Sequence, residues 1–135
     1  MILIVCVDDH NGMMFNHRRQ SQDRILRADI LELTGGKKLW MNAYSKKQFA
    51  ESDTARIRVN ETFLDAAGDG EFCFVENADV SGCVERIEEI YLYRWNRDYP
   101  ADVYFPVDLS VWKCVETKEF AGSSHEKITR ERYTR

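Results

Sequence analysis

The sequence predicts an α/β protein with a twisted, mostly parallel sheet and a C-terminal antiparallel hairpin. Strand-like segments alternate with segments of helical spacing from Ile2 to Trp95, which is typical of parallel strands joined by right-handed crossovers. The last two strand-like runs are separated only by Ala121-Gly122-Ser123-Ser124, a hairpin-like loop. With 135 residues, 44% of them apolar, the chain can bury one core, so we expect a single domain over residues 1–135.

The first strand, loop and helix follow from local patterns. Ile2–Val7 is a continuous apolar run, as expected for a strand buried on both faces of a sheet. Residues 8–20 are predicted to form a long polar loop. Ser21 is a suitable N-cap, and Asp23 places negative charge in the first turn of the following helix. Gly35-Gly36 ends that helix, whose apolar residues recur at Ile25, Leu26, Ile30 and Leu33.

The middle of the chain continues the alternation. Three more strands are predicted at Lys38–Asn42, Arg56–Val59 and Glu71–Glu76. Short helices are predicted from a Ser45 cap through Phe49 and Ala50, over residues 60–67 with Asn60 as the cap, and over residues 79–86.

The C-terminal third is predicted to complete the sheet. Glu89–Trp95 is the fifth strand, and its alternating Tyr91, Tyr93 and Trp95 are expected to pack under a helix. Residues 96–110 contain both prolines and are predicted to form a loop. The hairpin strands are Val111–Phe120 and His125–Tyr133, and His125 is expected to lie at the exposed start of its strand.

Charge and cysteine content narrow the class of protein. Lys and Arg number 19 against 23 Asp and Glu, a net charge of −4, which disfavours nucleic acid as a partner. The longest apolar run, residues 1–7, is too short to span a membrane and has no signal-peptide features, so we expect a cytoplasmic protein with no membrane partner. No C-x-x-C pair is present, and we expect four free thiols, with Cys6, Cys73 and Cys114 buried.

The carboxyl ends of the parallel strands are the expected ligand edge. The predicted loop at residues 8–20 leaves this edge and is longer than most such connections, which tend to be functional when long. Arg18, Arg19 and Arg24 form a basic cluster there that could bind a small polar or anionic ligand, with Asp23 orienting it. The alternative is that these arginines only neutralise Asp8, Asp9 and Asp23.

Three titratable residues are candidates for catalysis. Asp23 could act as a general acid or bind a protonated heterocycle, or it could simply be a helix N-terminal charge. His10 and His17 could serve as acid and base in metal-independent RNA cleavage, or they could be structural histidines of the loop.

Several segments carry a family resemblance. Val7-Asp8 opens a loop that leads to Ser21-Gln22-Asp23-Arg24, and later come Phe105-Pro106 and Asp108-Leu109-Ser110-Val111-Trp112. In this order the chain resembles a dihydrofolate reductase domain over nearly its whole length. The resemblance implies the same sheet order, and it places Asp23 where the reductase acid stands.

Two turns depart from the reductase pattern. Reductases bind NADPH with a G-R-x-[ST] turn and a glycine-rich turn, whereas this chain has Asn42-Ala43-Tyr44-Ser45 and Val75-Glu76-Asn77-Ala78. The Glu76 carboxylate repels phosphate, and side chains stand where bare backbone is needed. We therefore expect no cofactor and no NADPH-dependent reduction, with Asn42, Ser45 and Glu76 as further candidate ligand-binding residues.

A weaker resemblance concerns residues 6–24, which look like the start of short bacterial proteins named ribonuclease Z. Ribonuclease Z binds zinc through an H-x-H-x-D-H motif, whereas the histidines here are His10, His17 and His125. We therefore expect no metal. The sequence leaves two classes of function open, namely a ligand- or partner-binding protein and a small enzyme, either a pteridine or folate reductase or a metal-independent ribonuclease. It does not indicate an oligomeric state.

Overall fold

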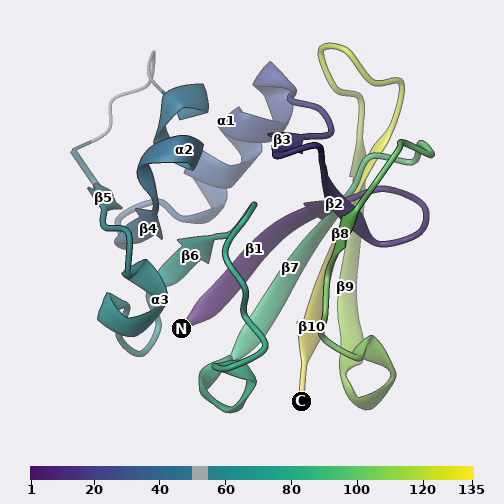
Figure 1. Ribbon diagram of the computed structural model, residues 1–135. Helices are drawn as coiled ribbons and strands as arrows, with labels where there is room; N and C mark the ends of the chain where they lie inside the picture. Colours follow the sequence, from purple (N-terminus) through teal and green to yellow (C-terminus); the bar gives the residue numbers. More distant parts are fainter. Residues whose placement is uncertain (50–54) are drawn as a thin grey trace.

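A seven-stranded sheet forms the centre of the molecule (Figure 1). The structure is a computed structural model that describes residues 1–49 and 55–135. The strand order is β5-β4-β6-β1-β7-β10-β9. The first five strands in this order run parallel to one another, and β10 pairs antiparallel with both β7 and β9. Both predictions, a mostly parallel sheet and a C-terminal hairpin, are confirmed. The strands are β1 (Ile2–Val7), β4 (Leu39–Met41), β5 (Ile57–Val59), β6 (Phe72–Phe74), β7 (Glu89–Arg94), β9 (Lys113–Phe120) and β10 (Ile128–Thr134).

A second, three-stranded sheet occupies the two segments that the sequence predicted to be loops. It consists of β3 (Arg18–Arg19), β2 (Gly12–Phe15) and β8 (Val103–Tyr104), in that order. Met13 and Met14 are only 7% and 2% exposed, so burial of this apolar pair against the main sheet favours a hairpin over an open loop. Gly12 is required at the hairpin base, because a Cβ there would lie 2.6 Å from the Ala101 Cβ.

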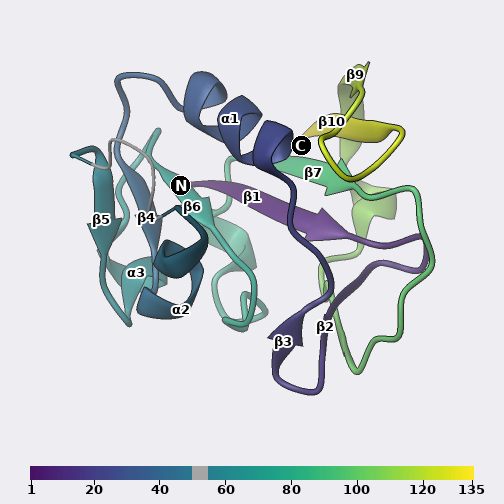
Figure 2. The ribbon, with the colours of Figure 1, turned by 90° about the horizontal axis from the view of Figure 1, so that it is seen from above.

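The core has two layers, one on each face of the main sheet. Ile2 and Ile4 of β1 pack with the layer that contains α1 (Arg24–Leu33), including Leu26 and Ile30. Leu3 and the other odd-numbered residues of β1 pack on the opposite face, in the layer that contains the β2 methionines. Figure 2 shows α1 on one side of the sheet and β2 and β3 on the other. The continuous apolar run of β1 is thus buried on both faces, as predicted.

The helix starts differ from the sequence prediction. α1 begins after Asp23, whose extended backbone makes it the N-cap, so Asp23 is not in the first turn and Ser21 is not the cap. α2 (Ala43–Lys46) is capped by Asn42 rather than by Ser45, and a 3-10 turn, η1 (Lys47–Phe49), continues it. In both cases the true cap is the residue whose side chain reaches the free N–H groups of the first turn. The predicted end at Ala50 lies outside the described residues.

The remaining predicted helices are shorter in the structure. α3 covers Phe63–Ala66, and its N-cap residue is Thr62, although the Asn60 side chain accepts a hydrogen bond from the Thr62 N–H. Residues 79–86 contain only the 3-10 turn η2 (Val84–Arg86), and a third such turn, η3, covers Leu109–Val111. No described helix has the length and apolar character needed to cross a membrane.

The four cysteines are free, as predicted, but their burial differs from the prediction. Cys73 is buried, Cys6 and Cys83 are partly buried, and Cys114 is exposed. The prediction for Cys114 was wrong because β9 is the edge strand of the sheet, and all its residues before Phe120 are exposed.

Candidate functional site

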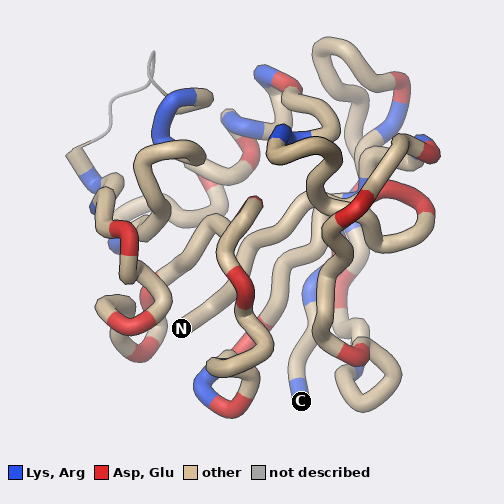
Figure 3. Tube along the Cα trace, viewed as in Figure 1, with Lys and Arg blue, Asp and Glu red and all other residues tan. Residues whose placement is uncertain are grey.

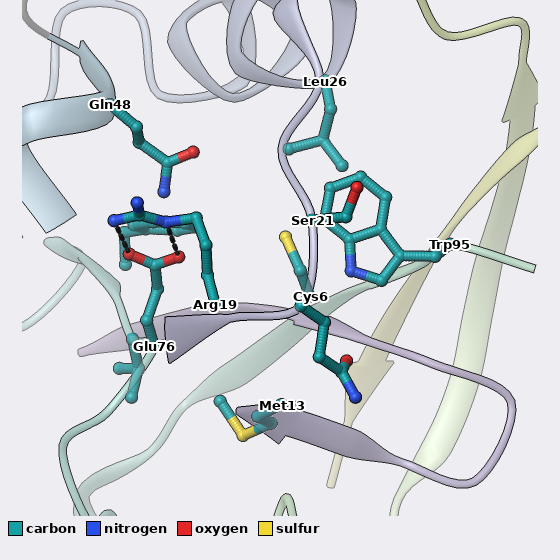
Figure 4. Close-up of a pocket in the computed structure, with 11 residues that line it drawn as sticks. Cys6, Met13, Arg19, Ser21, Leu26, Gln48, Glu76 and Trp95 are labelled. Atoms are coloured by element: carbon teal, nitrogen blue, oxygen red, sulfur yellow. Dashed lines mark hydrogen bonds and ion pairs between the residues drawn. The ribbon is translucent and has the colours of Figure 1, made fainter. Parts of the chain in front are cut away.

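The expected ligand edge is almost closed. The carboxyl ends of β1, β6 and β7 meet there, and a cavity of about 10 Å³ lies between Cys6, Val75 and Trp95 and the start of the segment leading to α1. Figure 4 shows Arg19 and Glu76 facing each other on one side of this cavity, with Ser21, Leu26 and Trp95 on the other. A cavity of this size holds about one water molecule.

Arg19 and Glu76 bind each other across this edge. The Arg19 Nε and Nη2 atoms donate to the two Glu76 carboxylate oxygens at 2.9 and 3.1 Å. The guanidinium also lies 4.4 Å from the centre of the Tyr44 ring and donates to the Tyr44 carbonyl oxygen. Burial alone lowers the pKa of Arg19, but the Glu76 carboxylate more than offsets this and raises it. Both side chains are therefore committed to a bidentate ion pair.

The three arginines of the predicted cluster do not line one common hollow. Arg18 is exposed on β3 and lines a surface hollow with Phe15, Arg19 and Tyr99. Arg24 is exposed at the start of α1 and lines a third hollow, with a volume of about 450 Å³. The structure therefore does not bring Arg18, Arg19 and Arg24 to one point. The carboxylate that neutralises Arg19 is Glu76, rather than any of the three aspartates considered from the sequence.

The hollow beside Arg24 is the most basic of these surfaces. It lies between α1 and α2–η1, and Arg24, Arg27 and Lys47 contribute its three positive charges. Figure 3 shows Lys and Arg positions gathered on this side of the molecule, over β3, the start of α1 and the end of α2. Within the described part of the chain, none of the three cations forms an ion pair with a carboxylate.

Asp23 is buried and fully engaged by protein groups. One carboxylate oxygen accepts hydrogen bonds from the Ile25 and Leu26 N–H groups of α1 at 2.9 and 3.1 Å. The loop between β9 and β10 binds the same carboxylate through the Ser123 and Ser124 N–H groups at 3.0 and 2.9 Å. Burial would raise the pKa of Asp23, but these hydrogen bonds outweigh it and hold the pKa well below its usual range.

His125 completes the contacts of Asp23. Its Nδ1 atom lies 3.0 Å from the carboxylate, and its Nε2 atom lies 3.1 Å from both the Ser21 and the Tyr99 hydroxyl oxygens. The imidazole stacks on the Trp95 ring at 4.5 Å and is buried, so the prediction of an exposed residue was wrong. Asp23 and His125 are 102 positions apart, and no local sequence pattern relates them.

Asn42 and Ser45 lie close together at the N-terminal end of α2. The Asn42 side chain accepts from the Ser45 N–H at 3.0 Å and donates to the Asn77 side chain at 2.7 Å. The Ser45 hydroxyl is buried and has no hydrogen-bond partner among the described residues. The side chains of Asn42 and Asn77 thus join the ends of β4 and β6, in the two turns that depart from the reductase pattern.

His10 and His17 lie at opposite ends of β2. His10 is exposed, 3.7 Å from Asp98, and His17 is an exposed turn residue between β2 and β3 with a φ of 62°. The four-residue strand between them separates them by about 13 Å. They do not form an acid–base pair in this arrangement. The part of the chain that the structure describes contains no cluster of three or more His, Cys, Asp or Glu able to hold a metal ion.

Comparisons with known proteins find similarity at the level of structure. No model of a known protein family matches the sequence, and no curated protein matches it. A dihydrofolate reductase from Enterococcus faecalis, solved in complex with NADP(H) and RAB-propyl, superposes with a TM-score of 0.70 over 99% of this chain and 95% of that chain, at 12% sequence identity. None of these findings supports the ribonuclease Z resemblance. The chain therefore has a dihydrofolate-reductase-like fold.

Proposed function

We propose that this protein binds a small anionic ligand on a reductase-like scaffold, without NADPH-dependent reduction. The observation that carries the proposal is the hollow of about 450 Å³ lined by Arg24, Arg27 and Lys47. Small-molecule sites in proteins commonly have volumes of about 300–1,000 Å³. Three cations around one hollow, in a chain with a net charge of −4, favour a ligand that carries at least two negative charges.

The residues that lie near the expected nicotinamide site do not fit a dinucleotide. The Arg19–Glu76 ion pair lies at the ligand edge, and the adjoining cavity of about 10 Å³ is far too small for a nicotinamide or pteridine ring. Asn77 carries a side chain, bound to Asn42, in a turn where the family uses bare glycine backbone to approach a pyrophosphate. The solved structure with the same fold was determined with NADP(H). The features of the present chain described above support a scaffold that does not take this cofactor.

Asp23 does not complete a reductase site in this proposal. Its carboxylate accepts hydrogen bonds from α1 and from the β9–β10 loop, which leaves it directed away from the cavity at the ligand edge. An acid that protonates a bound heterocycle must reach that heterocycle. Asp23 also lines the hollow beside Arg24, but its side chain is fully buried, so we assign the anionic ligand to Arg24, Arg27 and Lys47.

The test is a thermal-shift and calorimetric titration with inorganic phosphate, citrate, ATP and NADPH. Binding to the native state raises the unfolding temperature, and a concentration one hundred times Kd stabilises the protein by about 2.7 kcal/mol. We expect at least one multivalent anion to bind the wild-type protein. Binding should fall at least tenfold in a triple variant, Arg24→Gln, Arg27→Gln and Lys47→Gln.

The matched control removes positive charge elsewhere. Lys37→Gln and Lys113→Gln change exposed lysines that have no ion-pair partner among the described residues. This double variant should bind the anion within about twofold of the wild type, because screening at physiological salt limits the influence of distant charges to about 8 Å. Equal loss in both variants would show that the effect is one of net charge, and no binding of any of the four anions would refute the proposal.

A further inference from the structure

The contacts of His125 form a continuous chain of hydrogen-bonding groups from a buried carboxylate to a serine hydroxyl. Asp23 lies 3.0 Å from Nδ1, and the Ser21 Oγ atom lies 3.1 Å from Nε2. Of these three residues only Asp23 also lines the anion hollow proposed above, and its side chain is fully buried, whereas Ser21 and His125 do not line that hollow. We propose that Ser21 is a nucleophile activated by His125, able to accept an acyl group from a small ester.

The hydrogen-bonding partners determine the tautomer of the His125 imidazole. Asp23 is held ionised by four backbone N–H groups and can only accept hydrogen bonds. Nδ1 must therefore carry the ring proton that points to Asp23, and Nε2 presents its lone pair to the hydroxyls. A base in this tautomer is what a serine nucleophile requires, and Asp23 is the positioning residue that fixes it.

His125 and Asp23 are more deeply buried than Ser21. The side chains of His125 and Asp23 are 2% and 0% exposed, so the base and its positioning carboxylate are shielded from water. Ser21 is only partly buried and lines the cavity of about 10 Å³ beside Cys6 and Trp95. Trp95 stacks on the imidazole and restricts its rotation. A cavity of this size has room for about one water molecule, so it cannot hold a large planar ring, and we place the ester on the partly exposed side of Ser21.

The reaction follows from these positions. The Ser21 Oγ atom forms a bond to the ester carbonyl carbon while its proton passes to His125 Nε2. The bond between that carbon and the alcohol oxygen then breaks, and His125 returns the proton to the departing alcohol. Water attacks the acyl-Ser21 ester in the second half of the cycle, gives one proton to His125, and releases the carboxylic acid, after which the proton returns to Ser21.

Tyr99 competes with Ser21 for the same nitrogen, since its hydroxyl also lies 3.1 Å from Nε2. A variant at Tyr99 can therefore show which of the two hydroxyls is the reactive group. Tyr99→Phe removes the second hydroxyl and leaves Nε2 to Ser21, so it should raise the reactivity of Ser21. If Tyr99 were the reactive group, the same change would abolish reaction.

The experiment uses diisopropyl fluorophosphate, which forms a bond to an activated serine oxygen and releases fluoride. Unactivated serine hydroxyls are weak nucleophiles, so modification of Ser21, located by peptide mass mapping, reports activation directly. We expect a single modification at Ser21 that is lost in Ser21→Ala and retained in Ser110→Ala, an exposed serine in η3. His125→Gln should slow the reaction at least a hundredfold.

Thermal melting of every variant shows whether loss of labelling reflects loss of the fold. Should His125→Gln fail to fold, the Ser21→Ala and Tyr99→Phe pair still decides the question. A folded wild-type protein that remains unmodified at Ser21, or one modified at Tyr99 instead, would overturn the proposal. Neither result bears on anion binding, which is measured separately.

Discussion

Replacing Asp23 by alanine tests whether this carboxylate holds the fold together or serves a ligand. The change removes the N-cap of α1, which costs about 0.5–2 kcal/mol. It also removes the carboxylate acceptor of the buried His125 Nδ1–H and leaves only the Ser124 hydroxyl, 3.2 Å away, at a further cost of about 1–3 kcal/mol. The N–H groups of Ser123 and Ser124 belong to exposed residues and can donate to water instead, so the loss of their Asp23 acceptor adds little to the cost in stability. The expected loss is about 3 kcal/mol.

The measurement is urea unfolding at pH 7, with Asp23→Asn as the second variant. Asparagine keeps an oxygen for the Ile25 and Leu26 N–H groups but places an amide where the carboxylate meets His125, so we expect a loss of about 1–2 kcal/mol. Asp9→Ala, an exposed change, is the control and should stay within about 0.5 kcal/mol of the wild type. A change below 1 kcal/mol for Asp23→Ala, or a gain in stability, would refute the structural role, since residues kept for ligand chemistry often cost stability.

Three further predictions follow from the same structure. NADPH should give no saturable fluorescence change at micromolar concentrations, and a clear titration would show that the closed ligand edge opens. Native thiol labelling should be fast at the exposed Cys114 and slow at Cys73, whose pKa burial raises to about 12; equal rates would contradict the burial. The pKa values of Asp23 and Asp29 are lowered in the folded state, because hydrogen bonds and nearby cations outweigh burial, so their stabilisation is complete above the unfolded value of about 3.9 and is lost as the pH falls below it. Urea unfolding from pH 6 to pH 2 checks this, and stability that rises on acidification would be inconsistent with it.

The sheet could be predicted from the sequence because the patterns that indicate its strands are local. The uninterrupted apolar run of residues 2–7 required burial on both faces, and the alternation of strand and helix patterns required parallel strands with crossovers. The resemblance to reductases also led us to expect that a pyrophosphate would not fit at Glu76, where the turn lacks glycine, and this stays a prediction. By contrast, the hairpin of β2 and β3 was missed, since Met13 and Met14 form a strand only because the main sheet offers a surface to bury them.

The candidate site depended on contacts between residues far apart in the chain. The sequence marked Arg18, Arg19 and Arg24 as one basic cluster, but Arg18 and Arg19 of β3 line one hollow while Arg24 at the start of α1 lines another. Arg19 is bound by Glu76, 57 positions away, and no local pattern indicates that pair. His125 reaches Asp23 only because the β9–β10 loop folds over the start of α1, where Gly122 passes so close that a Cβ would lie 2.9 Å from the Asp23 Cγ. Local patterns therefore determined the elements, while burial and pairing across the folded chain decided which of the candidate residues remain available to a ligand.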